Sequence, residues 1–319
     1  MRTLTEEEEQ EPLEDKTAAI PLRSNRTKRI QKKKAAQEHK QQINPKPTLP
    51  DLPTELILDI LELLRPSDIF TFSSVNRRFN ALVNANADKI GDEVIRRRYA
   101  ILSRCFPVPV LLSAVEPSVQ PLLSNPRRGQ QLGIHRSAYQ HVQPPDAQVI
   151  CTCLTCILAW NNLSLVLDFA HWQDNLDNGV PIPMLPRGRT EQWNEELVSR
   201  NARIARKALE QPLWHALILE AHLASTVRAI RRHHSNKGNQ RKHVHMSEAE
   251  AASGSDHFLA KEGPLSLEFP YNRDEYYMLE AYLPNRWWRK FERYYFYTLE
   301  GQHERDVEMV VRTATQMQK

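Results

Sequence analysis

The sequence is poor in cysteine and glycine, with four and nine residues respectively among 319. Three of the cysteines crowd into Cys151–Cys156, which is not the scattered pattern of a secreted disulfide scaffold and favours a reducing compartment. No glycine-rich phosphate loop, no Gly-x-Ser-x-Gly and no His-Glu-x-x-His occurs. Because no catalytic motif is present, we expect the chain not to be an enzyme by itself, and we expect no cofactor.

Long apolar runs are also missing. No stretch of about 18 uninterrupted apolar residues exists, and the N-terminus is acidic, so neither a transmembrane helix nor a secretory signal is predicted. Lys and Arg total 43 against 39 Asp and Glu, and the resulting net charge of +4 is too small by itself to indicate nucleic-acid binding. These features predict a soluble protein of the nucleus, the cytoplasm or both, without a membrane partner.

Composition divides the chain into four predicted segments. Residues 1–47 contain an acidic block and a basic block with almost nothing apolar, so they are predicted to be disordered. A compact unit at 48–98 is followed by a proline-rich, irregular connection at 99–148. Residues 149–319 are predicted to form a mostly helical domain with long loops, of which 235–262 is expected to be mobile. The predicted fold class is therefore mainly α.

Helical periodicity organises the C-terminal domain. Apolar residues step by three or four through 149–172, which predicts a buried helix with Asn161 as its one polar position. Pro212 interrupts a second helical region and predicts a break, with a fresh helix from Leu213 to about Arg232. The end of the chain, 271–318, is helical in pattern and rich in aromatic residues.

The stretch TELILDILELL at 54–64 is more apolar than an ordinary surface helix, because seven of its eleven residues are Leu or Ile. On a helix, six of these side chains span an arc of about 160°, and Leu58 widens the arc to about 200°. A small helical unit covers a stripe only about 100° wide. The remaining apolar surface therefore needs another part of this chain or a different protein.

This stretch belongs to a longer pattern. L-P-x-E-L-I-x-x-I-L-x-x-L is followed by P-S-D-I-F, where Ser67 and Asp68 are predicted to cap a second helix, and then by S-V-N-R-R-F-N-A-L-V. Between Leu52 and about Ile95 the sequence resembles the F-box. The resemblance implies a three-helix module that docks on a Skp-type adaptor and so joins a cullin–RING ubiquitin ligase. Two departures are that Phe79 stands where many members have Trp, and that no Trp follows Val83.

Carried over position by position, the resemblance implies an adaptor-binding face. Its residues are Leu52, Pro53, Leu56, Ile57, Ile60, Leu64, Ile69, Val75 and Phe79. The C-terminal region is similar to those of filamentous-fungal F-box proteins and would present a target protein. The chain would then be a non-catalytic substrate receptor of an SCF-type ligase. The structural alternative is a plain helical hairpin buried within its own chain.

The run CTCLTC places Cys151, Cys153 and Cys156 at a spacing that can bind zinc if a fourth ligand comes from elsewhere. The candidates for that ligand are Cys105, His135, His141 and His171. An apolar helix through this run would turn Cys151 and Cys153 about 200° apart, which argues against a shared ion. Since free cysteine commonly packs as a small apolar residue, we favour core packing, predict no metal, and keep zinc as the alternative.

The segment PNRWWRKFERYYFYTLE at 284–300 mixes aromatic residues with Arg and Lys. Trp288, Phe291 and Tyr295 recur at helical spacing, which favours a core helix. Trp and Arg are also enriched in the hot spots of protein interfaces. The predicted substrate-binding residues are Arg286, Trp287 and Arg289.

A rival function uses the positive charge of the chain. Seven Lys or Arg lie within Arg23–Lys34, a pattern typical of nuclear import signals. This cluster and the Arg–aromatic segment could make the chain a nuclear nucleic-acid-binding or chromatin-associated protein. The His-rich basic segment 231–245 could touch phosphates, although we interpret it as a solvated linker. Of the two functions, we favour the adaptor-binding one.

Overall fold

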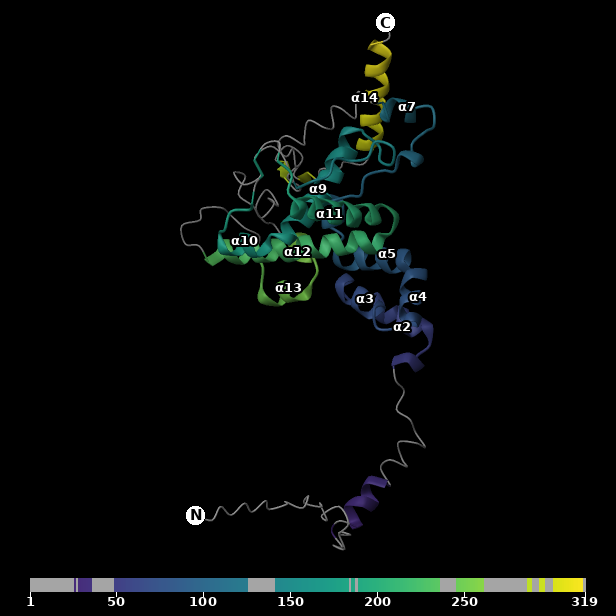
Figure 1. Ribbon diagram of the computed structural model, residues 1–319, viewed down its shortest axis with the longest axis vertical. Helices are drawn as coiled ribbons and strands as arrows, with labels where there is room; N and C mark the ends of the chain where they lie inside the picture. The colour runs from purple at the N-terminus through teal and green to yellow at the C-terminus, as the bar shows by residue number, and fades with distance from the viewer. Residues whose placement is uncertain are drawn as a thin grey trace, which may run out of the picture. The chain divides into compact units, whose positions relative to one another are not determined.

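The computed structural model describes residues 26, 28–35, 49–125, 141–183, 185–186, 189–235, 245–260, 286–288, 293–295 and 301–317. The chain divides into two compact units, residues 1–56 and 57–319. Nearly all of the described elements are helices, which confirms the mainly α fold class (Figure 1). None of the described helices combines the length and the apolarity that crossing a membrane requires.

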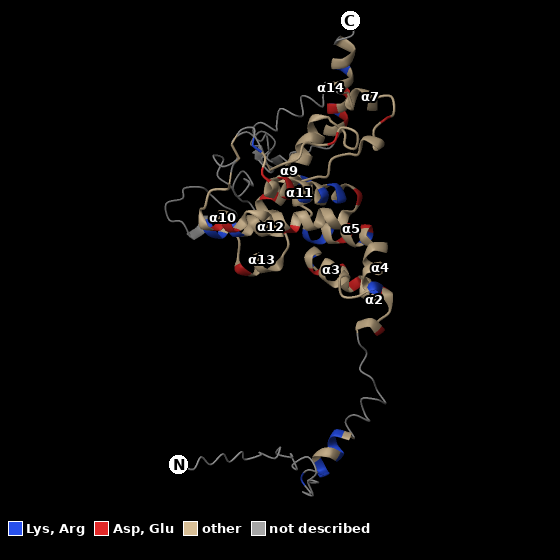
Figure 2. Cartoon of the chain, viewed as in Figure 1, with Lys and Arg blue, Asp and Glu red and all other residues tan. Residues whose placement is uncertain are grey.

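The first unit contains a short helical stretch at 28–35, in the tail that was predicted to be disordered. Its side chains are exposed, and Lys and Arg gather on it (Figure 2). Lys and Ala are strong helix formers, which accounts for a helix without a core. The unit also holds the 3-10 turn η2 (Leu49–Asp51) and the first residues of α2.

Four short helices follow one another where the F-box was predicted. They are α2 (Thr54–Leu61), α3 (Pro66–Ser73), α4 (Arg77–Ala85) and α5 (Ala87–Arg98). The side chain of Asn76 accepts a hydrogen bond from the Phe79 backbone N–H at 2.8 Å and so caps the start of α4. The ring of Phe79 stacks on that of Phe72 at 4.2 Å, which joins α4 to α3. Helices α2, α3 and α4 correspond to the predicted three-helix module, and each of them contributes buried residues.

The long helix α12 (Pro212–Ser235) is the scaffold of the second unit. It packs against α3, α5, α9 (Leu154–His171) and α11 (Gln192–Glu210). The break predicted at Pro212 is confirmed, because α11 ends two residues earlier and Pro212 opens α12. Proline fits the first turn of a helix, where its missing N–H would have no intrahelical partner.

Two contacts join the N-terminal helices to α12. The Glu220 carboxylate accepts hydrogen bonds from the backbone N–H and the hydroxyl of Ser67, each at 2.8 Å. Ser67 therefore does not cap α3 as predicted, because it lies inside the first turn and its own N–H needs an acceptor. At Gly91 of α5 the backbones approach so closely that an added Cβ would lie 2.2 Å from the Leu213 nitrogen.

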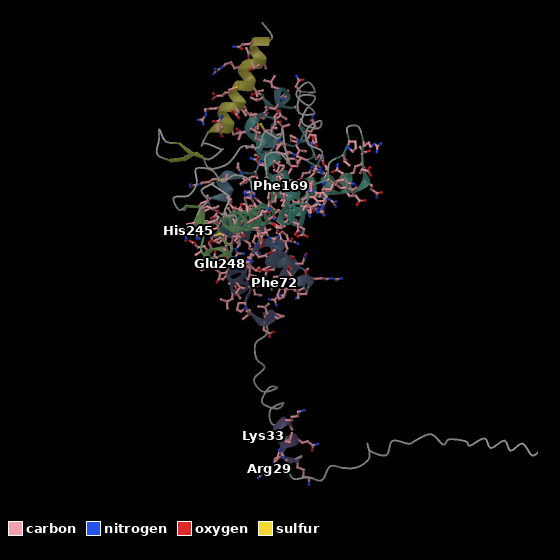
Figure 3. All side chains as sticks on the ribbon, turned by 90° about the vertical axis from the view of Figure 1, so that its left-hand side faces the viewer. Arg29, Lys33, Phe72, Phe169, His245 and Glu248 are labelled. Carbon is pink, nitrogen blue, oxygen red and sulfur yellow. The ribbon has the colours of Figure 1, made fainter. Side chains whose placement is uncertain are left out.

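Helix α9 is buried, as the apolar periodicity predicted, but Asn161 is not its one polar position, because Asn162, Ser164 and Asp168 are buried as well. Asn161 and its neighbours from Thr155 to Phe169 are almost all buried, and Figure 3 places Phe169 in the densely packed interior. The helix begins at Leu154 rather than at residue 149.

The prediction of a mobile loop at 235–262 is wrong for its second half. The elements observed there are α13 (Glu248–Ser253) and η5 (His257–Ala260). A capping box that starts at Ser247 opens α13. One oxygen of Asp256 accepts the backbone N–H groups of Ile101 and Leu102, each at 2.8 Å. This buried carboxylate anchors the segment, and such a long-range contact leaves no periodic signal in the sequence.

Where the structure describes the proline-rich connection, its helical pieces are short. They are α6 (Leu102–Cys105), η3 (Leu112–Ala114) and α7 (Gln120–Leu123). The short helix α10 (Gln173–Asn178) follows α9. The last helix, α14 (Gln302–Met317), packs against α9 and α7 (Figure 1).

The Arg–aromatic segment does not form the predicted core helix where the structure describes it. Strands β1 (Arg286–Trp288) and β2 (Arg293–Tyr295) pair antiparallel, with Trp287 opposite Tyr294. Trp and Tyr favour strands, and helical spacing over so short an aromatic run does not distinguish the two structures. Arg289 and Phe291 lie outside the described residues.

Candidate functional site

Helix α2 carries two different apolar faces. Ile57 and Leu61 are fully buried in the core of the helical module. Leu56 and Ile60, one turn apart, are 49% and 39% exposed. The two faces lie about 100° apart around the helix. The wide apolar arc of the sequence is therefore one core face and one exposed face.

The remaining residues of the predicted adaptor face fall into three groups. Pro53 and Val75 are exposed, and Leu52 and Leu64 are half-buried. Ile69 and Phe79, like Ile57, are buried within the chain, so in this conformation their side chains face the module core and not a partner. Their role in an interface would be to hold the exposed residues in position.

One exposed apolar residue next to this face is not among the residues that the F-box resemblance implied. Leu63, just beyond the C-terminal end of α2, is 56% exposed. The Leu63 N–H donates to the Ile60 carbonyl at 3.0 Å in the turn that ends the helix, so Leu63 follows directly on the exposed face. Leu63 was one of the Leu and Ile residues in the apolar arc predicted for 54–64. The sequence therefore indicated it, although the family pattern did not select it.

A second cluster lies where α9 and α14 begin. The ligand atoms of Cys151, Cys153, Cys156 and His303 all lie within 4.8 Å of one another. His303 Nδ1 is 3.4 Å from the Sγ atoms of both Cys153 and Cys156. The three cysteines are buried and His303 is half-buried. Thiolate sulfur and imidazole nitrogen are the commonest ligands of structural zinc in proteins.

Backbone pairing, and not a helix, positions the first two cysteines. Residue Ile150 forms an antiparallel bridge with Leu111, and the Cys151 N–H donates to the Val110 carbonyl at 2.9 Å. Cys153 has extended backbone angles and stands immediately before α9. The 200° separation expected for a helix therefore does not apply, and the argument against a shared ion was wrong on this point.

The surroundings of the sulfur atoms favour negative charge. The Val110 N–H donates to Cys156 Sγ at 3.4 Å, and the Cys153 N–H donates to Cys151 Sγ at 3.5 Å. The positive end of the α9 dipole lies at Cys153. Hydrogen bonds from Cys153 and Cys156 lower the pKa of Cys151, and their bonds to Cys151 raise the pKa of both partners.

None of the described residues proposed as a fourth ligand joins this cluster. His141 bonds to the Asn194 side chain at 2.7 Å and to the Pro183 carbonyl at 3.0 Å, and His171 contacts Arg200. Cys105 is buried elsewhere, and His135 lies outside the described residues. His303, nearly 150 residues from the cysteines, was missed because nothing in its local sequence marks it as a ligand.

Helix α14 is fixed beside the cysteines by further contacts. One oxygen of Asp306 accepts the Thr155 backbone N–H at 2.9 Å and the Thr155 hydroxyl at 2.5 Å. The other oxygen accepts from Gln302 at 2.7 Å. Val307 and Val310 pack against the core cluster that contains the three cysteines. The first turn of α14, which carries His303, is therefore held against the first turn of α9.

The helices α2, α3 and α4, with an exposed apolar face on the first of them, lie within one segment of the chain. A comparison with protein-family models matches the F-box domain over residues 49–90. The chain therefore contains an F-box domain over these residues, which confirms the resemblance found in the sequence. No curated protein and no solved structure matches it.

Proposed function

We propose that this F-box protein is a non-catalytic substrate receptor of an SCF-type ubiquitin ligase, docked on a Skp-type adaptor through its F-box. The observation that carries the proposal is the exposed apolar face of α2, formed by Leu56 and Ile60 inside the matched F-box domain. A helix that presents clustered Leu and Ile to a partner's groove gains affinity from their burial. Charged residues such as Glu55 and Asp59 are exposed beside them and fit the rim of such an interface.

The test substitutes Leu56→Asp and Ile60→Asp together in the full chain. Each buried apolar anchor contributes about 1.5–3 kcal/mol, so losing both should weaken adaptor binding by about 100-fold or more. Both side chains are exposed, and the thermal stability of the chain should therefore change little. Val180→Asp is the matched control, since Val180 is equally exposed but lies outside the F-box. Co-purification of the double variant with the adaptor at the wild-type yield would overturn the proposal.

The target protein must bind away from the adaptor face, and we place its site in the C-terminal region. Arg286 and Trp287 lie on strand β1 of the hairpin, and Trp and Arg are the residue types most enriched in binding hot spots. Replacing Trp287 by Ala should release the target while adaptor binding stays at the wild-type level. Quantitative comparison of the proteins that co-purify with the two chains tests this, and an unchanged set would move the site elsewhere.

We further propose that the basic cluster Arg23–Lys34 is a nuclear import signal, so that the protein is present in the nucleus, the cytoplasm or both. Its described Lys and Arg are exposed on the helical stretch 28–35, where Figure 3 labels Arg29 and Lys33. Such exposure is what a receptor for basic segments requires. A fluorescent reporter fused to residues 1–47 should accumulate in nuclei, and its exclusion would refute the signal.

A further inference from the structure

We propose that Cys151, Cys153, Cys156 and His303 form a structural zinc site that fastens α14 to the start of α9. Neither the F-box match nor the proposed adaptor function assigns any role to these residues. The site draws on two distant parts of the chain: the CTCLTC segment after the proline-rich connection, and the first turn of the last helix.

The distances fit one tetrahedral ion. Zinc lies about 2.3 Å from thiolate sulfur and about 2.1 Å from imidazole nitrogen, so two such ligands at the tetrahedral angle are about 3.6 Å apart. His303 Nδ1 lies 3.4 Å from Sγ of Cys153 and 3.4 Å from Sγ of Cys156. All four ligand atoms lie within 4.8 Å of one another. Two thiolate ligands of one tetrahedral zinc are about 3.8 Å apart, so a shift of about 1 Å or less would bring all four atoms to a common ion. If the cysteines served only as small apolar core residues, nothing would require an imidazole nitrogen to lie against two of their sulfur atoms.

The chemistry of the donor set selects zinc. Three soft sulfur ligands and one imidazole nitrogen suit Zn²⁺, whereas calcium and magnesium prefer oxygen. A divalent cation would deprotonate all three thiols, and the backbone N–H groups of Val110 and Cys153 already donate to the sulfur atoms of Cys156 and Cys151. Four protein ligands complete the coordination, which makes the site structural and leaves no open position for a substrate.

The site also explains how the chain end is held. Besides the cluster, α14 meets α9 through the Asp306–Thr155 hydrogen bonds and packs Val307 and Val310 on the core. Many of the remaining side chains of α14 are exposed, so its own apolar contact is limited. An ion bound between α9 and α14 would be held only when the two helices are packed together. Its binding free energy would therefore stabilise that packing.

The test measures zinc in the purified full chain by elemental analysis. The wild type should carry about one zinc per chain. Cys153→Ser and His303→Ala should each lower zinc affinity by at least about 100-fold, since losing a ligand costs more than losing an outer-shell partner. Cys105→Ser is the matched control, because Cys105 is equally buried but lies outside the cluster, and it should keep the full zinc content.

Two measurements on the wild type keep the proposal testable if the ligand variants do not fold. Replacing zinc by Co²⁺ should give the visible absorption bands of a tetrahedral thiolate site. Titration with an organomercurial should release the zinc as thiols are modified. A wild type purified with zinc that contains none, or ligand variants that keep as much zinc as Cys105→Ser, would overturn the proposal.

Discussion

At the scale of single residues, one helix carries side chains of the same type with opposite roles. Leu56 and Ile60 are exposed on α2, whereas Ile57 and Leu61 are buried on its other face. The sequence predicted that the apolar arc was too wide for one core, and this was correct. Which Leu or Ile faced outward could not be read from composition, because it depends on where α3 and α4 pack.

Buried histidines on α12 give a residue-scale prediction of pH dependence. His222 is 2% exposed, and burial lowers its pKa from 6.5 to about 3. Between these values the unfolded chain binds a proton that the folded chain does not, so stability is lost as the pH falls below about 6.5. At about pH 5 this contribution amounts to about 2 kcal/mol relative to neutral pH.

Urea unfolding at about pH 7 and pH 5 measures the effect. The wild type should lose about 2 kcal/mol more on acidification than His222→Gln, in which the titrating group is gone. His245→Gln removes an exposed histidine and should behave as the wild type does. An identical pH dependence in the wild type and His222→Gln would contradict the assignment.

At the scale of elements, the predictions held where the pattern was long and failed where contacts were distant. The break at Pro212 followed from proline chemistry, and the buried helix α9 followed from the apolar periodicity through 149–172. Helix α13 was missed because its anchor, Asp256, acts on the backbone of Leu102, more than 150 residues away. The β1–β2 hairpin was missed because its aromatic residues also fit helical spacing.

The packing of α5 on α12 yields an element-scale prediction. A Cβ at Gly91 would lie 2.2 Å from the Leu213 nitrogen and 2.5 Å from the Pro212 carbonyl carbon, and backbone atoms cannot move aside as a flexible side chain can. Gly91→Ala should therefore lower the unfolding free energy by roughly 1–3 kcal/mol or more, as overpacking does. Asp92→Ala, at the exposed neighbouring position, should change it by less than about 0.5 kcal/mol. Equal thermal unfolding temperatures of the two variants would show that the helices can separate at little cost.

At the scale of the whole molecule, long-range contacts within the second unit join helices α3 and α5 to the C-terminal helices. Glu220 of α12 binds Ser67 of α3, Phe70 packs on Trp214 with ring centroids 4.5 Å apart, and Arg98 donates to the Ser253 carbonyl at 3.1 Å. The F-box itself could be predicted, since its motif is local and dense. The cysteine–histidine cluster could be predicted only in part, because His303 reaches it through the tertiary fold.

The central claim is that the F-box face binds a Skp-type adaptor through apolar contacts. Calorimetric titration of the purified full chain with purified adaptor, at about 0.1 M and about 1 M salt, tests this claim most directly. Between these salt concentrations the Debye length falls from about 10 to about 3 Å, so binding through charges would weaken and binding through apolar contacts would not. We expect tight binding whose Kd changes by less than about tenfold between the two salts, and whose loss in Leu56→Asp/Ile60→Asp exceeds about 100-fold. Absence of binding by the wild type, or equal affinity of the double variant, would contradict the account.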